Sequence, residues 1–223
     1  MTLLLLLRHA ESEWNAVGRW QGIADPPLSE RGERQADQAA PRLATMGISA
    51  AVSSDLRRAR DTAERLSQAL ALRRPIGTDP DLREYDLGQW SGLTRGEIEA
   101  GWPGEIALWR AGELVATPGG ERRDHFVRRI TGAIARVART AAGDTVLVVT
   151  HGGVISAVAR SLGTPQRFNH LSGLWVEASG EGWAWPADGR QPLVSLIGSI
   201  SPPLDRGEGI EVADPEVMDT VGH

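Results

Sequence analysis

The stretch that decides the fold is TLLLLLRH, residues 2–9, in which five consecutive leucines precede an arginine and a histidine. Five apolar residues are too few for a membrane span, which takes about 20. A short apolar run of this kind is typical of a strand buried at the centre of a sheet. A second such run, residues 146–149, is rich in β-branched residues and leads into Thr150 and His151. The sequence therefore predicts two buried strands, each ending at a histidine.

Helical patterns alternate with strands along the chain. We predict helices over about 29–46, 56–70, 94–100, 104–112, 121–141 and 154–162, and further strands over 48–52, 75–78 and within 173–200. The second helix is expected to be capped by residues 53–55. This alternation predicts an α/β fold: a three-layer, mostly parallel sheet with helices on both faces. Ligands of such sheets bind beyond the carboxyl ends of the strands. We therefore expect His9 and His151 to face the same crevice.

The length of 223 residues suits a single domain with a sizeable core. We expect one catalytic domain over residues 1–200, carrying an insertion of loops and short helices, a cap, over about 86–120. That insertion is rich in Gly, Pro and Trp. Residues 201–223 contain several Pro and Gly residues, and we expect them to form a flexible tail.

The composition excludes several kinds of chemistry. The chain has no cysteine, which excludes cysteine nucleophiles, disulfides and cysteine-bound metals. It also has no lysine, so all 24 basic side chains besides histidine are arginines, and Schiff-base or P-loop lysine chemistry is excluded. The net charge of −5 (24 − 29) disfavours non-specific binding to nucleic acid. The first apolar run lacks the basic flank of a signal peptide. We expect a cytoplasmic protein that binds neither nucleic acid nor membrane.

Arg8 and His9 form an unusual pair for a purely structural role. A permanently charged guanidinium lowers the pKa of a neighbouring imidazole and keeps the ring neutral, and a neutral imidazole is a nucleophile or a base. The alternative is a surface Arg-His dipeptide, which is the commoner state of such a pair in isolation. The residues that follow favour chemistry: they are RHAESEWN (8–15), QG (21–22) and LSERG (28–32).

These segments resemble the opening motif of the histidine phosphatase superfamily, the phosphoglycerate-mutase-like proteins. The family usually has Gly where this chain has Ala10. Three further segments resemble family motifs in the same order: SSDLRRARDTA (53–63), LREYDLGQWSG (82–92) and VVTHGG (148–153). The resemblance covers about residues 2–165, and four motifs in order are a specific signal. It implies a phosphoglycerate-mutase-like fold.

The resemblance also implies roles for individual residues. His9 would attack phosphorus and form a phosphohistidine, and Glu84 would protonate the leaving alkoxide and then accept a proton from water. The catalytic set is His9, Glu84, His151, Arg8 and Arg58, and the phosphate- or substrate-binding set is Arg8, Asn15, Gln21, Gly22, Arg58, His151 and Gly152. Planar guanidinium donors match phosphate geometry. Because they supply the positive charge, we expect no metal ion and no cofactor.

Each of these residues also has a structural interpretation. Arg58 could be one of several solvated helix arginines, Glu84 a surface carboxylate paired with Arg83, and His151 a helix cap. His125 is expected to be structural, and His170 to shape a wall of the site without a catalytic part. Five tryptophans in the loops could either pack those loops or line a pocket for an apolar leaving group: Trp14, Trp20, Trp90, Trp102 and Trp109.

The family includes mutases, which return the phosphoryl group to a sugar acid instead of water. Mutases typically have a Tyr where Leu87 stands, a Trp-Arg-Arg where this chain has Trp109-Arg110-Ala111, and His-Gly-Asn where it has His151-Gly152-Gly153. Arg95 takes the place of one mutase cation. The missing anion-binding groups favour water as the acceptor.

We therefore expect a metal-independent phosphomonoester hydrolase, a histidine phosphatase, that acts on a small phosphorylated metabolite. Glu121, in a GGE segment typical of the small phosphatases, would orient the site or cap its helix. The alternatives are a cofactor-dependent phosphoglycerate-type mutase and a non-catalytic module that binds a phosphorylated ligand. The expected partner is a small phosphate ester, and pairing into a homodimer through an edge strand or the 173–200 hairpin is left open.

Overall fold

The protein, seen in a computed structural model, is described over residues 1–197. The strands are β1 (Thr2–Arg8), β2 (Ala50–Ser53), β3 (Gly77–Thr78), β4 (Thr145–Thr150), β5 (Ser172–Ala178), β6 (Trp183–Ala184) and β7 (Leu193–Ser195). The helices are α1 (Glu13–Ala16), α2 (Glu30–Leu43), α3 (Arg57–Ser67), α4 (Arg95–Gly101), α5 (Glu105–Ala111), α6 (Arg123–Thr140) and α7 (Gly152–Ser161), with 3₁₀ turns η1 (Pro80–Leu82) and η2 (Gly88–Trp90). The tail that we expected over 201–223 lies outside the described residues.

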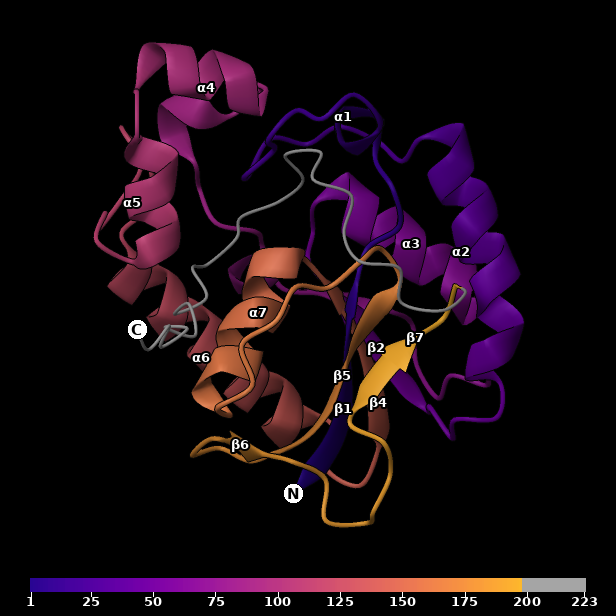
Figure 1. Cartoon of the computed structure of the whole chain (residues 1–223). Helices are drawn as coiled ribbons and strands as arrows, with labels where there is room; N and C mark the ends of the chain where they lie inside the picture. Colours follow the sequence, from indigo (N-terminus) through magenta and orange to yellow (C-terminus); the bar gives the residue numbers. More distant parts are fainter. Residues whose placement is uncertain (198–223) are drawn as a thin grey trace, which may run out of the picture.

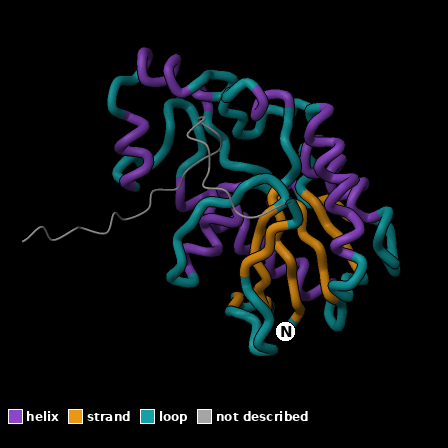
Figure 2. Tube along the Cα trace, turned by 45° about the vertical axis from the view of Figure 1, so that its right-hand side comes forward, coloured by secondary structure: helices purple, strands orange, loops and turns teal. Residues whose placement is uncertain are grey.

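β1 lies inside a sheet with the strand order β3-β2-β4-β1-β5-β6, and β7 also pairs with β5. The strands from β3 to β1 are parallel, whereas β5 runs antiparallel to β1, β6 and β7. Leu3–Arg8 of β1 pair in register with Thr145–Thr150 of β4. The two strands therefore end side by side, at the end of the molecule where loops and short helices gather (Figure 2).

Helices cover both faces of this sheet, with α6 and α7 on one side and α2 and α3 on the other (Figure 1). Successive side chains of a strand point to opposite faces. Leu4 and Leu6 accordingly pack with side chains of α6 and α7, and Leu5 and Leu7 pack with those of α2 and α3. The run of leucines is thus explained by burial on both faces. The predicted fold class, a three-layer, mostly parallel α/β sheet, is confirmed.

A third apolar cluster joins the segment between η2 and α6 to the 8–28 loop and to side chains of α6 and α7. It contains the indole rings of Trp20, Trp90 and Trp109, all almost completely buried, together with Tyr85 and Phe126. Trp90 contacts both other indoles edge-on, with ring centroids 5.7 Å from Trp20 and 6.4 Å from Trp109. These three tryptophans pack the segment that carries α4 and α5 against the 8–28 loop, so the packing interpretation holds for them and the pocket-wall interpretation does not.

Local structure differs from the sequence prediction at the start of two helices. α3 begins at Arg57, and its N-cap residue Leu56 makes no side-chain cap. The expected caps bind elsewhere, because Asp55 pairs with Arg83 and the Ser54 hydroxyl accepts from the backbone N–H of Leu56. α7 begins at Gly152, two residues earlier than predicted, with His151 as its N-cap residue. Among residues 1–197, no helix is long and apolar enough to cross a membrane.

Candidate active site

The ends of β1 and β4 bring two imidazoles together. The backbone N–H of His9 donates to the carbonyl oxygen of Thr150 over 3.0 Å, which continues the β1–β4 pairing beyond the strands. The rings of His9 and His151 meet edge-on, with centroids 5.2 Å apart, and both side chains are buried. Residues that lie 142 positions apart in the chain therefore share one site.

His9 is held in one tautomer by its neighbours. Its Nδ1 lies 2.7 Å from the carbonyl oxygen of Ala10. A carbonyl oxygen can only accept, so Nδ1 carries the proton and donates it. The other nitrogen, Nε2, is then unprotonated, and its lone pair accepts a hydrogen bond from Nε of Arg58 over 3.3 Å. His9 thus presents an unprotonated Nε2 beside a guanidinium group.

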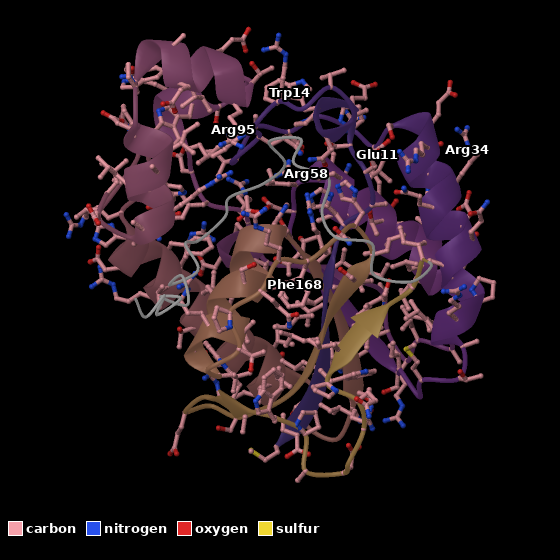
Figure 3. All side chains as sticks on the ribbon, in the orientation of Figure 1. Glu11, Trp14, Arg34, Arg58, Arg95 and Phe168 are labelled. Atoms are coloured by element: carbon pink, nitrogen blue, oxygen red, sulfur yellow. The ribbon has the colours of Figure 1, made fainter. Side chains whose placement is uncertain are left out.

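Arg58 lies in the first turn of α3 and is 1 % exposed, so it is not a solvated surface arginine. Its Nη1 donates to the carbonyl oxygen of Ala24 and its Nη2 to that of Gly22, over 2.7 and 2.8 Å. Burial lowers its pKa to about 10. The 8–28 loop thereby fixes the guanidinium plane at the carboxyl end of the sheet, where Figure 3 labels Arg58.

Arg8, the last residue of β1, supplies a second buried guanidinium. Its Nη1 donates to the carbonyl oxygen of Phe168 over 2.8 Å. The Cβ that a side chain at Gly152 would carry lies 3.5 Å from Nε of Arg8. The start of α7 therefore packs directly against this guanidinium group.

Glu84 is buried and faces the first turn of α7. Its Oε2 accepts from the backbone N–H of Gly153 over 3.0 Å, and its Oε1 from that of Tyr85 over 2.9 Å. Burial raises the pKa of the Glu84 carboxyl, while those two N–H groups and the nearby Arg58 and Arg8 oppose the rise. The site thus contains a carboxyl group that binds a proton more readily than an exposed glutamate does. It is not paired with Arg83, which binds Asp55 instead.

A small cavity connects these groups. It is lined by Arg8, His9, Asn15, Gln21, Gly22, Arg58, Glu84 and Leu87. The side-chain oxygens of Asn15 and Gln21 both lie within hydrogen-bond distance of the Ser12 hydroxyl. Their NH₂ groups are thereby left as donors for the cavity. His151 and Gly152 are not among the residues that line the cavity. His151 contacts the ring of His9, and Gly152 packs against Arg8.

Burial makes these imidazoles poor bases. It is the largest cause that lowers the pKa of both His9 and His151 well below the usual value, and Arg58 and Arg8 lower both further. Both rings are therefore neutral near pH 7. Among residues 1–197, neither ring nitrogen of His151 has a hydrogen-bond partner. A bound anion would accept a hydrogen bond from whichever of the two nitrogens carries the proton.

Two features of the site go beyond the sequence prediction, which did not include Arg129 and expected His170 only to shape a wall. Arg129 of α6 donates to the carbonyl oxygens of Asp81, Arg83 and Glu84, and it pairs with Glu121 over 2.8 Å. Glu121 therefore acts on the segment around Glu84 through Arg129. The second feature is His170, whose ring lies 5.8 Å from that of His9. Only its spatial neighbours distinguish Arg129 from the many other arginines, and only the fold shows that His170 contacts His9.

Other predicted features lie away from this centre. His125 is exposed on α6 beside Asp124. Arg95 begins α4, and Figure 3 labels it near Trp14 at the loop-rich end of the molecule. Within the described residues, no three His, Asp or Glu side chains are grouped so that they could hold a metal ion.

The fold and this site define an enzyme of the α/β type that handles phosphate esters. The family model of the histidine phosphatase superfamily (branch 1) matches residues 4–178. A glucosyl-3-phosphoglycerate phosphatase of Mycolicibacterium vanbaalenii is 38 % identical over 190 residues, which cover 79 % of this chain and 84 % of that protein. The bifunctional protein Rv2228c of Mycobacterium tuberculosis is 41 % identical over 71 % of this chain, but the match spans only 43 % of its length.

A solved structure agrees with these sequence matches. The mycobacterial glucosyl-3-phosphoglycerate phosphatase Rv2419c, in its complex with VO₃, superposes with a TM-score of 0.71 at 34 % identity, covering 79 % of this chain and 93 % of that one. The chain therefore belongs to the histidine phosphatase superfamily, and the family predicted from its motifs is confirmed.

Proposed function

We propose that the chain hydrolyses a small phosphate monoester through a phosphohistidine on His9, without a metal ion. The observation that carries this proposal is the orientation of the His9 ring. Its protonated Nδ1 is tied to the carbonyl of Ala10, while its unprotonated Nε2 lies beside Arg58 on a cavity that Arg8 also lines. A nucleophile and two planar phosphate-binding groups therefore meet at one point.

The reaction then proceeds in two displacements. Nε2 of His9 attacks phosphorus, the P–O bond to the leaving group breaks, and Glu84 gives its proton to the leaving alkoxide. In the second step, water attacks the phosphorus, the P–N bond breaks, and the water proton passes to Glu84, which restores both residues. Arg8 and Arg58 stabilise the charge on the phosphoryl oxygens, and His151, Asn15 and Gln21 supply further hydrogen bonds.

Water is favoured over a sugar acid as acceptor by the residues on the wall of the cavity. Leu87, which stands where mutases have a tyrosine, is among the residues that line the cavity, and its side chain has no group that could bind an anion. A Cβ at Gly153, where mutases have an asparagine, would lie 2.3 Å from Oε1 of Glu84. This position therefore cannot hold an anion-binding side chain unless Glu84 moves. Both observations disfavour a mutase.

The relatives guide the choice of substrate. Because two of the matched proteins are glucosyl-3-phosphoglycerate phosphatases, we propose glucosyl-3-phosphoglycerate as the first substrate to test, ahead of phosphoserine and simple sugar phosphates. Residues 86–120 would form a cap that shapes the leaving-group side of the cavity. A small phosphate ester is the partner that the site favours. A homodimer, the absence of nucleic-acid binding and a place in the cytoplasm stay predictions.

The test is release of phosphate from p-nitrophenyl phosphate in the presence of EDTA. We expect turnover by the wild type, none by His9→Ala, and unchanged turnover by the control His125→Ala, whose side chain is exposed. Quenching in alkaline detergent should trap a phosphoenzyme that is stable to alkali and is lost on treatment with acid. Turnover that requires phosphoglycerate and bisphosphoglycerate would support a mutase. Tight phosphate binding without turnover would support a binding module.

A further inference from the structure

A third imidazole lies beside His9, although the mechanism above gives it no part. The ring of His170 is tilted by 43° against that of His9, with centroids 5.8 Å apart. Its side chain is buried, at 8 % exposure. It comes from the loop between α7 and β5, and so from a different part of the chain than either His9 or His151. The nucleophile is thus in contact with two imidazoles.

The Nε2 atom of His170 is enclosed and has no hydrogen-bond partner among residues 1–197. A buried ring nitrogen without a partner costs free energy, so native proteins usually pair it. His151 is in the same condition: it is buried, touches the His9 ring and has unpartnered nitrogens. Burial, with Arg8 and Arg31 adding to it, lowers the pKa of His170 well below its usual value. The ring is therefore neutral and has one N–H to donate.

The backbone around His170 is fixed in an unusual conformation. Leu171 has φ of 53°, and it is the one non-glycine residue with positive φ among those the structure describes. A bulky residue adopts that conformation only where its surroundings enforce it. Here the N–H of Leu171 donates to the carbonyl oxygen of Arg8, and the Arg8 guanidinium donates to the carbonyl of Phe168. Arg8 thus holds both ends of the turn that aims His170 at His9.

We propose that His170 is a further catalytic residue, whose Nε2–H donates a hydrogen bond to an oxygen of the phosphoryl group while His9 binds it. The proposal rests on the phosphoryl site of the proposed function. The rings of His9 and His170 are close enough for a group bound to one to touch the other. Three equatorial oxygens share the charge of the transferring group, so an additional donor has an acceptor available. The contact satisfies the enclosed nitrogen and accounts for the strained turn.

The decisive comparison is between His170→Gln and His170→Leu. Both side chains are close to histidine in size, but only glutamine keeps an N–H donor. Three measurements apply to each variant: kcat and KM for p-nitrophenyl phosphate, inhibition by vanadate, which mimics the five-coordinate transition state, and the shift in melting temperature that vanadate produces. His125→Ala serves as the control for removal of an imidazole, because its ring is exposed on α6.

We expect His170→Leu to lower kcat about 10- to 100-fold and to weaken vanadate inhibition by a similar factor, because removal of one donor to a developing anion has effects of this order or larger. KM should change by less than about threefold, and His170→Gln should recover most of the loss. Equal kinetics and vanadate affinity in the two variants, at matched melting temperatures, would show that the donor is not used and would overturn the proposal. A loss shared by both variants and matched by a fall in melting temperature would do the same.

The vanadate-induced melting shift needs no turnover, so it separates this proposal from the proposed function. Suppose that the wild type shows no turnover, but that vanadate raises the melting temperature of the wild type and of His170→Gln more than that of His170→Leu. The contact from His170 would then be supported, and the proposed phosphatase activity would be refuted.

Discussion

His9 takes its reactive form from two specific neighbours, and burial alone would not produce it. A buried neutral imidazole can place its proton on either nitrogen. The carbonyl of Ala10 fixes that proton on Nδ1, and Nε of Arg58 faces the free Nε2. The proposed nucleophile and one of the proposed phosphate-binding residues are therefore in direct contact.

Glu84 allows a direct test at this scale. Its carboxyl has a raised pKa because it is buried, which suits a group that must hold a proton for the leaving oxygen. Glu84→Gln removes that proton donor while keeping size and shape. We expect kcat for glycerol phosphate, a poor leaving group, to fall about 100-fold or more, and kcat for p-nitrophenyl phosphate to fall much less. Steady-state rates on both esters measure this difference.

The control for that variant is Glu113→Gln, an exposed change of the same chemistry. If Glu84→Gln slowed alkyl and nitrophenyl esters by the same factor, Glu84 would not be the acid. Its effect would then have to come from the packing of α7.

At the scale of elements, the first turn of α7 is built around Glu84. The site for a Cβ on Gly153 lies 2.3 Å from Oε1 of Glu84, so Gly153→Ala has to displace the carboxyl group. Displacement of a reacting group by about 1 Å can lower the rate about 100-fold. We therefore expect kcat to fall at least about tenfold, while the better helix propensity of alanine, about 1 kcal/mol, partly offsets the clash in stability.

Kinetics and thermal melting of Gly153→Ala check this prediction. Gly132→Ala in α6 is the matched control, since the nearest atom to its added Cβ would be 3.6 Å away, in a flexible arginine. The control should keep kcat. Full activity in Gly153→Ala would mean that Glu84 does not need its present position.

α6 also stabilises the position of Glu84, through Arg129. Arg129 donates to the carbonyl oxygens of Asp81, Arg83 and Glu84 and pairs with Glu121. Its side chain is 19 % exposed, so solvent screens the ion pair only in part. Arg129→Met leaves those oxygens without partners, and we expect the free energy of unfolding to fall by about 2 kcal/mol. We also expect a lower kcat, because Glu84 loses its support.

Urea denaturation and kcat measure both effects. Arg128→Met is the control at the preceding position of α6. The Arg128 side chain is 68 % exposed and, among the described ion pairs, pairs only with Asp124. A fall in stability of equal size in the two variants would argue against a special role for Arg129.

The elements that carry the site were predictable where local pattern and burial agree. Five leucines and the 146–149 run predicted β1 and β4, and apolar spacing predicted α6 to within two residues at its start. The predicted cap of α3 was wrong because a tertiary partner competed for it: Asp55 forms an ion pair with Arg83, 28 positions away. Local rules do not include such partners.

For the whole molecule, the meeting of His9 and His151 follows from strand direction, which the sequence indicated through two strands that each end at a histidine. The motifs also indicated Arg58 and Glu84. Two contributions were not predicted from the sequence: the contact of His170 with the His9 ring, and the support that Arg129 gives to the segment around Glu84. His170 depends on a turn that Arg8 holds in place, and Arg129 is one of 24 arginines, distinguished only by the carbonyl oxygens around it. Irregular backbone and side-chain networks decide both positions, and neither has a periodicity to detect.

The three buried imidazoles also make a prediction for the stability of the whole molecule. The folded-state pKa values of His9, His151 and His170 all lie well below the usual 6.5. As the pH falls below about 6.5, the unfolded chain takes up these protons and the folded chain does not, so each histidine lowers the free energy of unfolding by about 1 kcal/mol per pH unit. Glu84 acts in the opposite direction, because its raised pKa lets the folded state bind a proton first.

The three histidines lower the free energy of unfolding towards acid pH by more than the one glutamate raises it, so the protein becomes less stable. Urea denaturation at about pH 7.5 and about pH 5.5 should show it as a fall of at least about 1 kcal/mol. His170→Leu removes one of the three groups, so its free energy of unfolding should depend less steeply on pH than that of the wild type. His125→Ala, which removes an exposed ring, should leave the slope unchanged. Equal stability at the two pH values would mean that the imidazoles become protonated while the protein is folded. In that case the buried neutral cluster described for the site would be wrong.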